Sequence, residues 1–310
     1  MTEALIRIGT RGSPLALAQS EWVRRRLAAV WPELAVPDAV AIVPIRTTGD
    51  RIKDRPLAEV GGKGLFTKEI EEALIAGAID LAVHSAKDLP TLLPPGLAIV
   101  AALPREDPRD VFISRKAKTL RALTDGATVG TASLRRQALV KRLRPDLKVV
   151  TFRGNVETRL RKLDEGLVDA TLLALAGLRR LGLAEAATAI LDTEEFLPAV
   201  GQGIVALEAR ADDTRTRTLL DRINSPDDTT ALAAERAFLT VLDGSCRTPI
   251  AGHAKVAAGR ISFRGLIAKP DGSHVYETTR EGAAAQASVL GHDAGRELKE
   301  RAGAGFFVLA

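Results

Sequence analysis

The sequence predicts an α/β fold, with two α/β lobes around a cleft and a small C-terminal α+β domain. Short apolar segments alternate with stretches of helical periodicity through most of the chain. The alternation restarts after a charged, proline-containing stretch at 104–108 and meets a second hinge-like stretch at 198–203. With 310 residues, of which 46% are hydrophobic, the chain is long enough for two or three domains.

In the first lobe, strands and helices are expected to alternate. Ser13 and Pro14 suit the N-cap and first position of a helix, and Gly77 suits the end of another. The glycine-rich, charged segment 47–64 favours a mobile loop. The expected strands are 5–9, 40–46, 79–83 and 97–103, and the expected helices are 14–30 and 65–76.

The same alternation predicts the second lobe, and a different pattern predicts the C-terminal domain. Residues 250–281 alternate as an antiparallel meander, with a turn at 270–272. The strands expected before it are 111–114, 128–131, 148–152, 169–174 and 204–208. The expected helices are 134–143, 156–165, 175–181, 229–241 and 284–302. The predicted domains are 1–103 with 204–222, 104–203, and 223–310.

Composition argues against several classes of protein. No apolar run approaches the ~18 residues of a membrane span, and the first residues lack the pattern of a secretion signal. One cysteine and no visible signal favour a reducing cytoplasm. The formal net charge is only +5 and aromatic residues make up 4%, so a nucleic-acid surface is disfavoured.

Cationic residues gather where predicted strands end and helices begin. Arg11 precedes the Ser13 cap, and Ser133 precedes Arg135 and Arg136. Ligands of open α/β sheets bind at such edges, and arginine suits carboxylate or phosphate. A solvated basic face would explain any one of these residues. Their repetition predicts a ligand with several anionic groups, held also by Lys63, Arg153, Arg159, Arg179 and Arg180.

Cys246 and Asp88 are the candidates for chemistry. As the single cysteine, Cys246 cannot form an internal disulfide; it is either an inert buried thiol or one kept for covalent chemistry. Asp88 follows a predicted strand and, among arginines, should stay ionised, so that it could stabilise a cationic intermediate or hold a protonated amine. The alternative for Asp88 is an ordinary surface pair with Lys87. His84 has no partner at metal-ligand spacing, so we expect it to be structural, and we expect no metal site.

The chain resembles the porphobilinogen deaminase family. The resemblance rests on His84-Ser85-Ala86-Lys87-Asp88-Leu89-Pro90 together with Gly244-Ser245-Cys246. Further segments agree in order and spacing, and they cover nearly the whole chain: 10–16, 60–66, 105–110, 130–137, 153–156, 176–178 and 197–203.

The resemblance implies a transferase of tetrapyrrole biosynthesis, called hydroxymethylbilane synthase. Such an enzyme joins four porphobilinogen units head to tail, releases ammonia, and finally releases a linear product with water. The family carries a dipyrromethane cofactor on a thioether, which maps onto Cys246. Its fold has two lobes like a type II periplasmic binding protein and a third domain with the cysteine loop. A monomer with a small-molecule substrate, no nucleic acid and no membrane is expected.

The resemblance also implies roles for individual residues. Asp88 maps onto the catalytic aspartate, with Lys87 beside it, and Cys246 is an anchor that stays bonded through turnover. Cofactor contacts are implied for Arg11, Ser13, Lys87, Asp88, Thr131, Ser133, Arg135, Arg136, Arg153 and Gly154. Substrate contacts are implied for Arg11, Gln19, Lys63, Phe66, Arg153, Arg159, Arg180 and Gln202.

A few positions depart from the family pattern, and two other classes compete. Gly12, Glu59, Ser245 and Arg247 replace commoner residues, and these departures concern the details of loops. A secreted anion-binding protein would share the two lobes, but it would need a secretion signal and no Cys246. A nucleic-acid binder would explain the basic junctions, but it predicts steep salt dependence.

Overall fold

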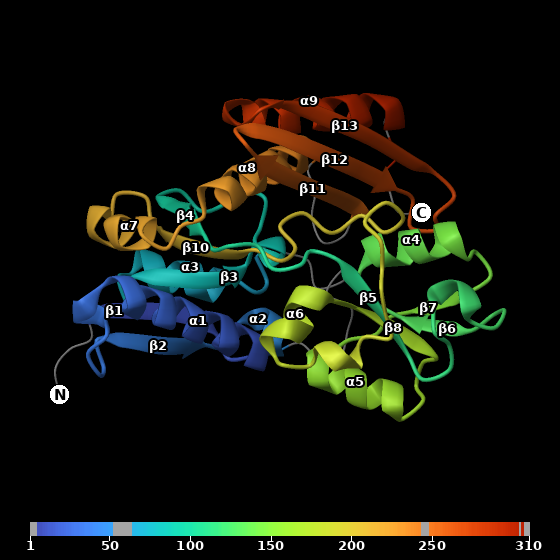
Figure 1. Cartoon of the computed structure of the whole chain (residues 1–310), viewed down its shortest axis with the longest axis horizontal. Coiled ribbons are helices and arrows are strands. Elements are labelled where there is room, and N and C mark those ends of the chain that lie inside the picture. Colours follow the sequence, from blue (N-terminus) through green and yellow to red (C-terminus); the bar gives the residue numbers. More distant parts are fainter. Residues whose placement is uncertain (1–4, 52–63, 243–247, 304, 307–310) are drawn as a thin grey trace. The chain divides into compact units, whose positions relative to one another are not determined.

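The protein consists of two compact units, which the computed structural model describes over residues 5–51, 64–242, 248–303 and 305–306. Unit 1 contains Met1–Arg105 and Ile204–Thr229, and unit 2 contains Glu106–Gly203 and Thr230–Ala310. Figure 1 shows the elements of each unit. Among the described helices, none is both long and apolar enough to cross a membrane.

Unit 1 is built on a five-stranded sheet of order β2-β1-β3-β10-β4. β1 pairs in parallel with β2 and β3, whereas β10 is antiparallel to β3 and β4. β10 thus comes from a distant part of the sequence and lies between β3 and β4 in the sheet. The bounds are β1 Ile6–Arg11, β2 Val40–Ile45, β3 Leu81–Ser85, β4 Leu97–Ala102 and β10 Val205–Arg210.

Helices cover both faces of this sheet because successive side chains of a strand point to opposite faces. Leu81 and Val83 pack in the core cluster that contains residues of α1 and α7, and Ala82 packs in the cluster beneath α3. The Ser13 hydroxyl caps α1 by accepting a hydrogen bond from the Ala16 N–H. The helices are α1 Pro14–Val30, α2 Thr48–Arg51, α3 Lys68–Ile75 and α7 Thr214–Asp221.

Unit 2 contains a second five-stranded sheet with the same arrangement, in the order β7-β6-β8-β5-β9. β6 is parallel to β7 and β8, and β5 is the antiparallel strand between β8 and β9. The strands are β5 Asp110–Ser114, β6 Thr128–Gly130, β7 Lys148–Val150, β8 Ala170–Ala174 and β9 Ala189–Ile190. The helices beside it are α4 Leu134–Leu143, α5 Val156–Asp164 and α6 Leu175–Arg180.

The rest of unit 2 is a three-stranded antiparallel sheet in the order β11-β12-β13, with two helices. Its core includes Phe238 of α8 and Phe263 of β12, whose ring centroids are 5.1 Å apart. Leu266 of β12 instead joins the core cluster of the five-stranded sheet of unit 2. The elements are α8 Pro226–Val241, β11 Ile250–Ala257, β12 Arg260–Ala268, β13 Val275–Ala283 and α9 Ala287–Ala302.

The predicted α/β class with a smaller C-terminal α+β part is confirmed, and most element boundaries agree within a few residues. One expectation was wrong, because Thr48–Arg51 forms a helical turn inside the expected loop. No element was expected at two further segments, the helix Thr214–Asp221 and the short strand Ala189–Ile190. Residues 52–63 lie outside the described part. The three-domain division remains our proposal, since the β11-β12-β13 sheet has a core of its own.

Gly291 marks a close approach between α9 and α8. A Cβ at this position would lie 2.1 Å from the backbone oxygen of Ala234, which cannot move aside as a flexible side chain would. Gly291→Ala should therefore lower the free energy of unfolding by about 1–3 kcal/mol, although alanine is the better helix former. Val289→Ala on the same helix is the control, because Val289 is 63% exposed. Equal stability of both variants in denaturant titrations would contradict this packing.

Candidate active site

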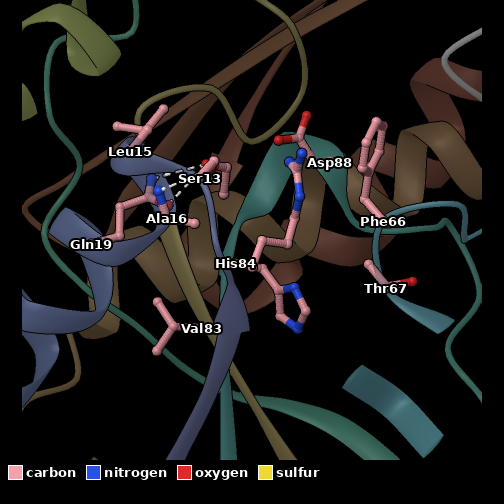
Figure 2. A pocket seen from close by; sticks show the side chains of 11 residues that line it. Ser13, Leu15, Ala16, Gln19, Phe66, Thr67, Val83, His84 and Asp88 are labelled. Atoms are coloured by element: carbon pink, nitrogen blue, oxygen red, sulfur yellow. Dashed lines mark hydrogen bonds between the residues drawn. The ribbon is translucent and has the colours of Figure 1, made fainter. Parts of the chain in front are cut away.

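A pocket in unit 1 lies where strands β1 and β3 end. The carboxyl ends of parallel strands meet at one edge of a sheet, where loops and helix N-termini offer polar groups. Figure 2 shows Ser13 and Gln19 on one side of this pocket and Phe66 on the other. The lining residues are Arg11, Ser13, Leu15, Ala16, Gln19, Phe66, Thr67, Val83, His84, Ser85 and Asp88.

Arg11, the last residue of β1, is held side-on by Asp50 of α2. The Arg11 Nε donates to both Asp50 carboxylate oxygens at 3.2 and 3.3 Å, and Nη2 donates to Oδ1. The guanidinium carbon also lies 4.2 Å from the centre of the Phe66 ring. Burial tends to raise the pKa of Asp50, but hydrogen bonds from Arg11 and Thr47 outweigh it and hold the pKa below its usual value.

Gln19 and Ser85 fix the opposite wall of the pocket. The Gln19 Nε2 donates to Ser85 Oγ at 2.9 Å, and the Ser85 hydroxyl donates to Gln19 Oε1 at 3.2 Å. Gln19 is buried on α1, and Ser85 is the last residue of β3. This reciprocal contact ties the helix to the strand from which Asp88 follows.

Asp88 ends a 3-10 turn, Ala86–Asp88, directly after β3. The turn is anchored by the Ala86 N–H, which donates to the Ile204 carbonyl at 3.0 Å. The Asp88 side chain is exposed and lines the pocket. Within the described ranges, no hydrogen bond or ion pair joins its carboxylate to another residue. Lys87 is half-buried and does not line the pocket.

Below the pocket, three titratable side chains are buried together. The His84 Nε2 lies 3.0 Å from Glu208 Oε2, and both side chains are almost fully buried. Burial, together with the charge of Glu208, raises the pKa of Glu71, against the opposing effects of Thr67 and His84. His84 therefore contacts Glu208, a buried glutamate of its own unit. In the described part of the chain, no three His, Cys, Asp or Glu residues are placed to hold a metal.

In unit 2, Arg135 and Arg136 converge on the buried carboxylate of Asp110. Arg135 Nη2 lies 2.6 Å from Oδ2, and Arg136 Nη2 lies 2.7 Å from Oδ1. Gln202 donates to the same carboxylate at 2.9 Å. Burial alone would raise the pKa of Asp110, but the two arginine charges and the hydrogen bonds hold it well below the usual range. Burial also lowers the pKa of Arg135, against the attraction of Asp110.

The other basic residues of unit 2 also follow its parallel strands. Arg153 and Gly154 come after β7, and the Arg159 Nε donates to the Gly154 carbonyl at 2.7 Å. Gly154 has a φ of 132°, a backbone conformation that residues with a Cβ rarely adopt. Arg180, at the end of α6, donates to the Gly203 carbonyl at 2.6 Å. Burial lowers the pKa of Arg180 to about 10, against the opposing charge of Glu106.

Thr131 and Ser133 follow β6 and shape the start of α4. The Thr131 hydroxyl accepts a hydrogen bond from the Ser133 N–H at 3.1 Å, and the Ser133 hydroxyl accepts one from the Arg136 N–H at 3.4 Å. Ser133 is thus the N-cap that the sequence predicts. The cap fixes the direction in which the two buried arginines leave the helix.

The structure brings together five of the predicted residues in the unit 1 pocket: Arg11, Ser13, Gln19, Phe66 and Asp88. Lys63 and Cys246 lie outside the described residues. The sequence did not identify the counter-ions Asp50 and Asp110. Asp50 could have been identified from its position after a predicted strand. Asp110 could have been identified because it ends segment 105–110, which agrees with the family resemblance described above.

Comparisons with known proteins cover nearly the whole chain. Residues 6–218 match the family description "Porphobilinogen deaminase, dipyromethane cofactor binding domain", and residues 229–300 match "Porphobilinogen deaminase, C-terminal domain". A porphobilinogen deaminase of Nitrobacter winogradskyi is 64% identical over 308 residues, covering 99% of this chain and 97% of its own. The corresponding protein of Nitrobacter hamburgensis is 63% identical with the same coverage.

Solved structures give more distant similarity. A periplasmic substrate-binding protein of an ABC transporter from Coxiella burnetii is 15% identical with a TM-score of 0.44, over 74% of this chain and 96% of its own. The aliphatic sulphonate binding protein SsuA from Escherichia coli is 17% identical with a TM-score of 0.41, over 80% and 73%.

The Asp110 cluster gives a test of stability. Asp110→Asn leaves two buried arginines without their carboxylate, so the free energy of unfolding should fall by about 3–5 kcal/mol. Asp125→Asn is the control, because this partner of Arg144 is 97% exposed and its loss should change stability little. Both values come from denaturant titrations monitored by circular dichroism.

The Asp110 cluster also predicts how the free energy of unfolding changes with pH. The folded-state pKa of Asp110 lies below its unfolded value of about 3.9, so its stabilisation is present above that pH and is lost as the pH falls further. The stability gap between wild type and Asp110→Asn should therefore be constant near neutrality and shrink below about pH 4. A gap that grows on acidification would show that Asp110 is not ionised in the folded protein.

Proposed function

The chain belongs to the porphobilinogen deaminase family, and we propose how its residues carry out the family's reaction. The protein is a transferase of porphyrin biosynthesis, hydroxymethylbilane synthase. It condenses four porphobilinogen molecules head to tail onto a dipyrromethane cofactor, with loss of ammonia, and hydrolysis then releases linear hydroxymethylbilane.

The described residues fit a dipyrromethane in their donor chemistry. The cofactor carries acetate and propionate groups, and arginine forks are suited to bind carboxylates. The Nε of Arg135 is buried and lacks a hydrogen-bond partner among the described residues, as expected of a donor kept for a ligand. When bound, the cofactor supplies the pyrrole carbon to which substrate is added. We propose that Cys246, outside the described residues, anchors it by a thioether.

Asp88 is the proposed catalytic residue. The observation that carries this role is its exposed carboxylate, which has no hydrogen-bond or ion-pair partner among the described residues and lies in a pocket with Arg11 and Ser13. Loss of ammonia leaves positive charge on the substrate pyrrole, and an ionised carboxylate at the pyrrole nitrogen stabilises that charge. The same carboxylate can accept and return a proton, with Lys87 beside it in the chain.

The remaining residues are proposed to bind carboxylates and pyrrole rings. In unit 1, Arg11 and Ser13 supply donors, and the Phe66 ring and the Gln19 amide complete the pocket. Arg135 and Arg136 retain N–H groups beyond those bonded to Asp110. The proposed contacts of unit 2 are Thr131, Ser133, Arg135, Arg136, Arg153 and Gly154 for the cofactor, and Arg153, Arg159, Arg180 and Gln202 for the substrate.

We further propose a monomer in the cytoplasm that acts without nucleic acid or membrane. The single cysteine suits a reducing compartment, where the thiol stays available for its cofactor. The modest net charge of +5 gives little non-specific attraction to nucleic acid. Lys63 is proposed to contact substrate from the glycine-rich segment, which lies outside the described residues.

Asp88→Asn tests the catalytic assignment. The amide keeps the size of the side chain but cannot stabilise a cation by its charge, so turnover of porphobilinogen should fall about 10²–10³-fold. Arg11 and the fold should be unaffected, which circular dichroism can check. Turnover within about threefold of wild type would remove Asp88 from this role, with Asp125→Asn as a surface control.

Cys246→Ser tests the anchor. A serine oxygen does not provide the thioether, so the intact mass of the variant should lack the dipyrromethane that wild type carries on the Cys246 peptide. Mass spectrometry of the intact protein and of its peptides measures both. A covalent dipyrromethane in the serine variant, or one mapped to another peptide in wild type, would refute this assignment.

A further inference from the structure

Arg11 presents two edges of its guanidinium, and Asp50 occupies one of them. The Nε and Nη2 groups bond to Asp50, as described above. Across the described ranges, no hydrogen bond joins Nη1 to another residue. The end formed by Nη1 and the second Nη2 proton is therefore available for another carboxylate, in the two-point geometry that arginine favours.

We propose that Asp50 is a positioning residue for substrate binding: it holds one edge of Arg11 so that the other edge can bind a substrate carboxylate. The inference rests on the proposed function, because it takes the acetate or propionate group of porphobilinogen as the ligand. Asp50 acts through Arg11 and need not touch the substrate.

The surroundings of Asp50 support a fixed rather than a mobile partner. The Thr47 hydroxyl donates to Asp50 Oδ2 at 2.8 Å, and Thr47 is fully buried. The Phe66 ring lies against the guanidinium and limits its swing. The lowered pKa of Asp50 keeps its carboxylate ionised at neutral pH. Thr47, Asp50 and Phe66 therefore determine where the open edge of Arg11 lies. Because the side chain is already ordered, substrate binding costs little additional conformational entropy.

The alternative role for Asp50 is competition with the substrate carboxylate for Arg11. If Asp50 merely occupied Arg11 until substrate arrived, it would compete with the substrate carboxylate. Removing its charge would then strengthen binding and lower KM. A positioning role predicts the reverse, because an untethered Arg11 must be ordered during binding.

The first experiment compares steady-state kinetics of the holoenzyme and its Asp50→Asn variant with porphobilinogen. We expect KM to rise about 10-fold, with kcat within about threefold, because a charge-assisted contact that orients the ligand site is lost. Asp80→Asn is the matched control. Asp80 binds Arg7 side-on, with Nε at 3.1 Å and Nη2 at 2.8 Å, and does not line the pocket. Its KM should equal that of wild type.

Three further variants separate a positioning role of Asp50 from a loss of fold. Thr47→Val removes only the hydroxyl that holds Asp50 and should raise KM less than Asp50→Asn does. Asp50→Glu keeps the charge and should recover part of the affinity. In an Arg11→Lys background, Asp50→Asn should have little additional effect, because lysine offers no second edge to orient.

A spectroscopic measurement reads the contact without turnover. In nitrogen-15 spectra of the holoenzyme, the Arg11 Nε–H should exchange slowly with solvent and lose that protection in Asp50→Asn. An unchanged or lower KM in Asp50→Asn, or an unchanged Nε–H signal, would overturn the proposal. Failure of the wild-type enzyme to consume porphobilinogen would instead overturn the proposed function, so the two failures are distinguishable.

Discussion

The parallel pairing of strands is the constraint on which the site depends. β1, β2 and β3 run in the same direction, so their carboxyl ends lie at one edge of the sheet. Arg11 ends β1, Asp50 follows β2, and Asp88 follows β3. These residues are far apart in the sequence, yet the sheet places them together without any long loop. β6, β7 and β8 repeat the arrangement for the basic residues of unit 2.

A protein that gathers arginines for an anionic ligand must also fold when the ligand is absent. Like charges repel, and a buried guanidinium without a carboxylate is costly. Both units meet this requirement with an internal aspartate, Asp50 beside Arg11 and Asp110 between Arg135 and Arg136. The first pair is partly exposed, and within the described ranges one edge of Arg11 stays open. The second is buried, and its two arginines keep N–H groups beyond those bonded to Asp110.

Local sequence signals predicted much of this architecture, but not the pairing of charges. The Ser13 and Ser133 caps, the strand periodicity and the family motifs are local or ordered features, and they located Asp88 and the arginines. The contact of Asp110 with Arg136 joins residues 26 positions apart, and that of Arg11 with Asp50 joins residues 39 apart. Such partners depend on strand order, which periodicity alone does not give. α7 was missed because its sequence, Thr214–Asp221, is short and strongly polar, with Leu219 and Leu220 as its apolar residues.

The pairing of Arg11 with Asp50 also bears on why Asp88 remains available. Arg11 and Asp88 line the same pocket, and their opposite charges attract each other. If Asp50 were absent, Asp88 would be the acidic side chain of that lining to which Arg11 could turn. An ion pair there would satisfy the carboxylate and weaken its response to positive charge on a bound pyrrole. In the proposed mechanism, Asp50 therefore holds Arg11 away from Asp88, so that substrate binding and charge stabilisation fall to separate side chains of one small pocket.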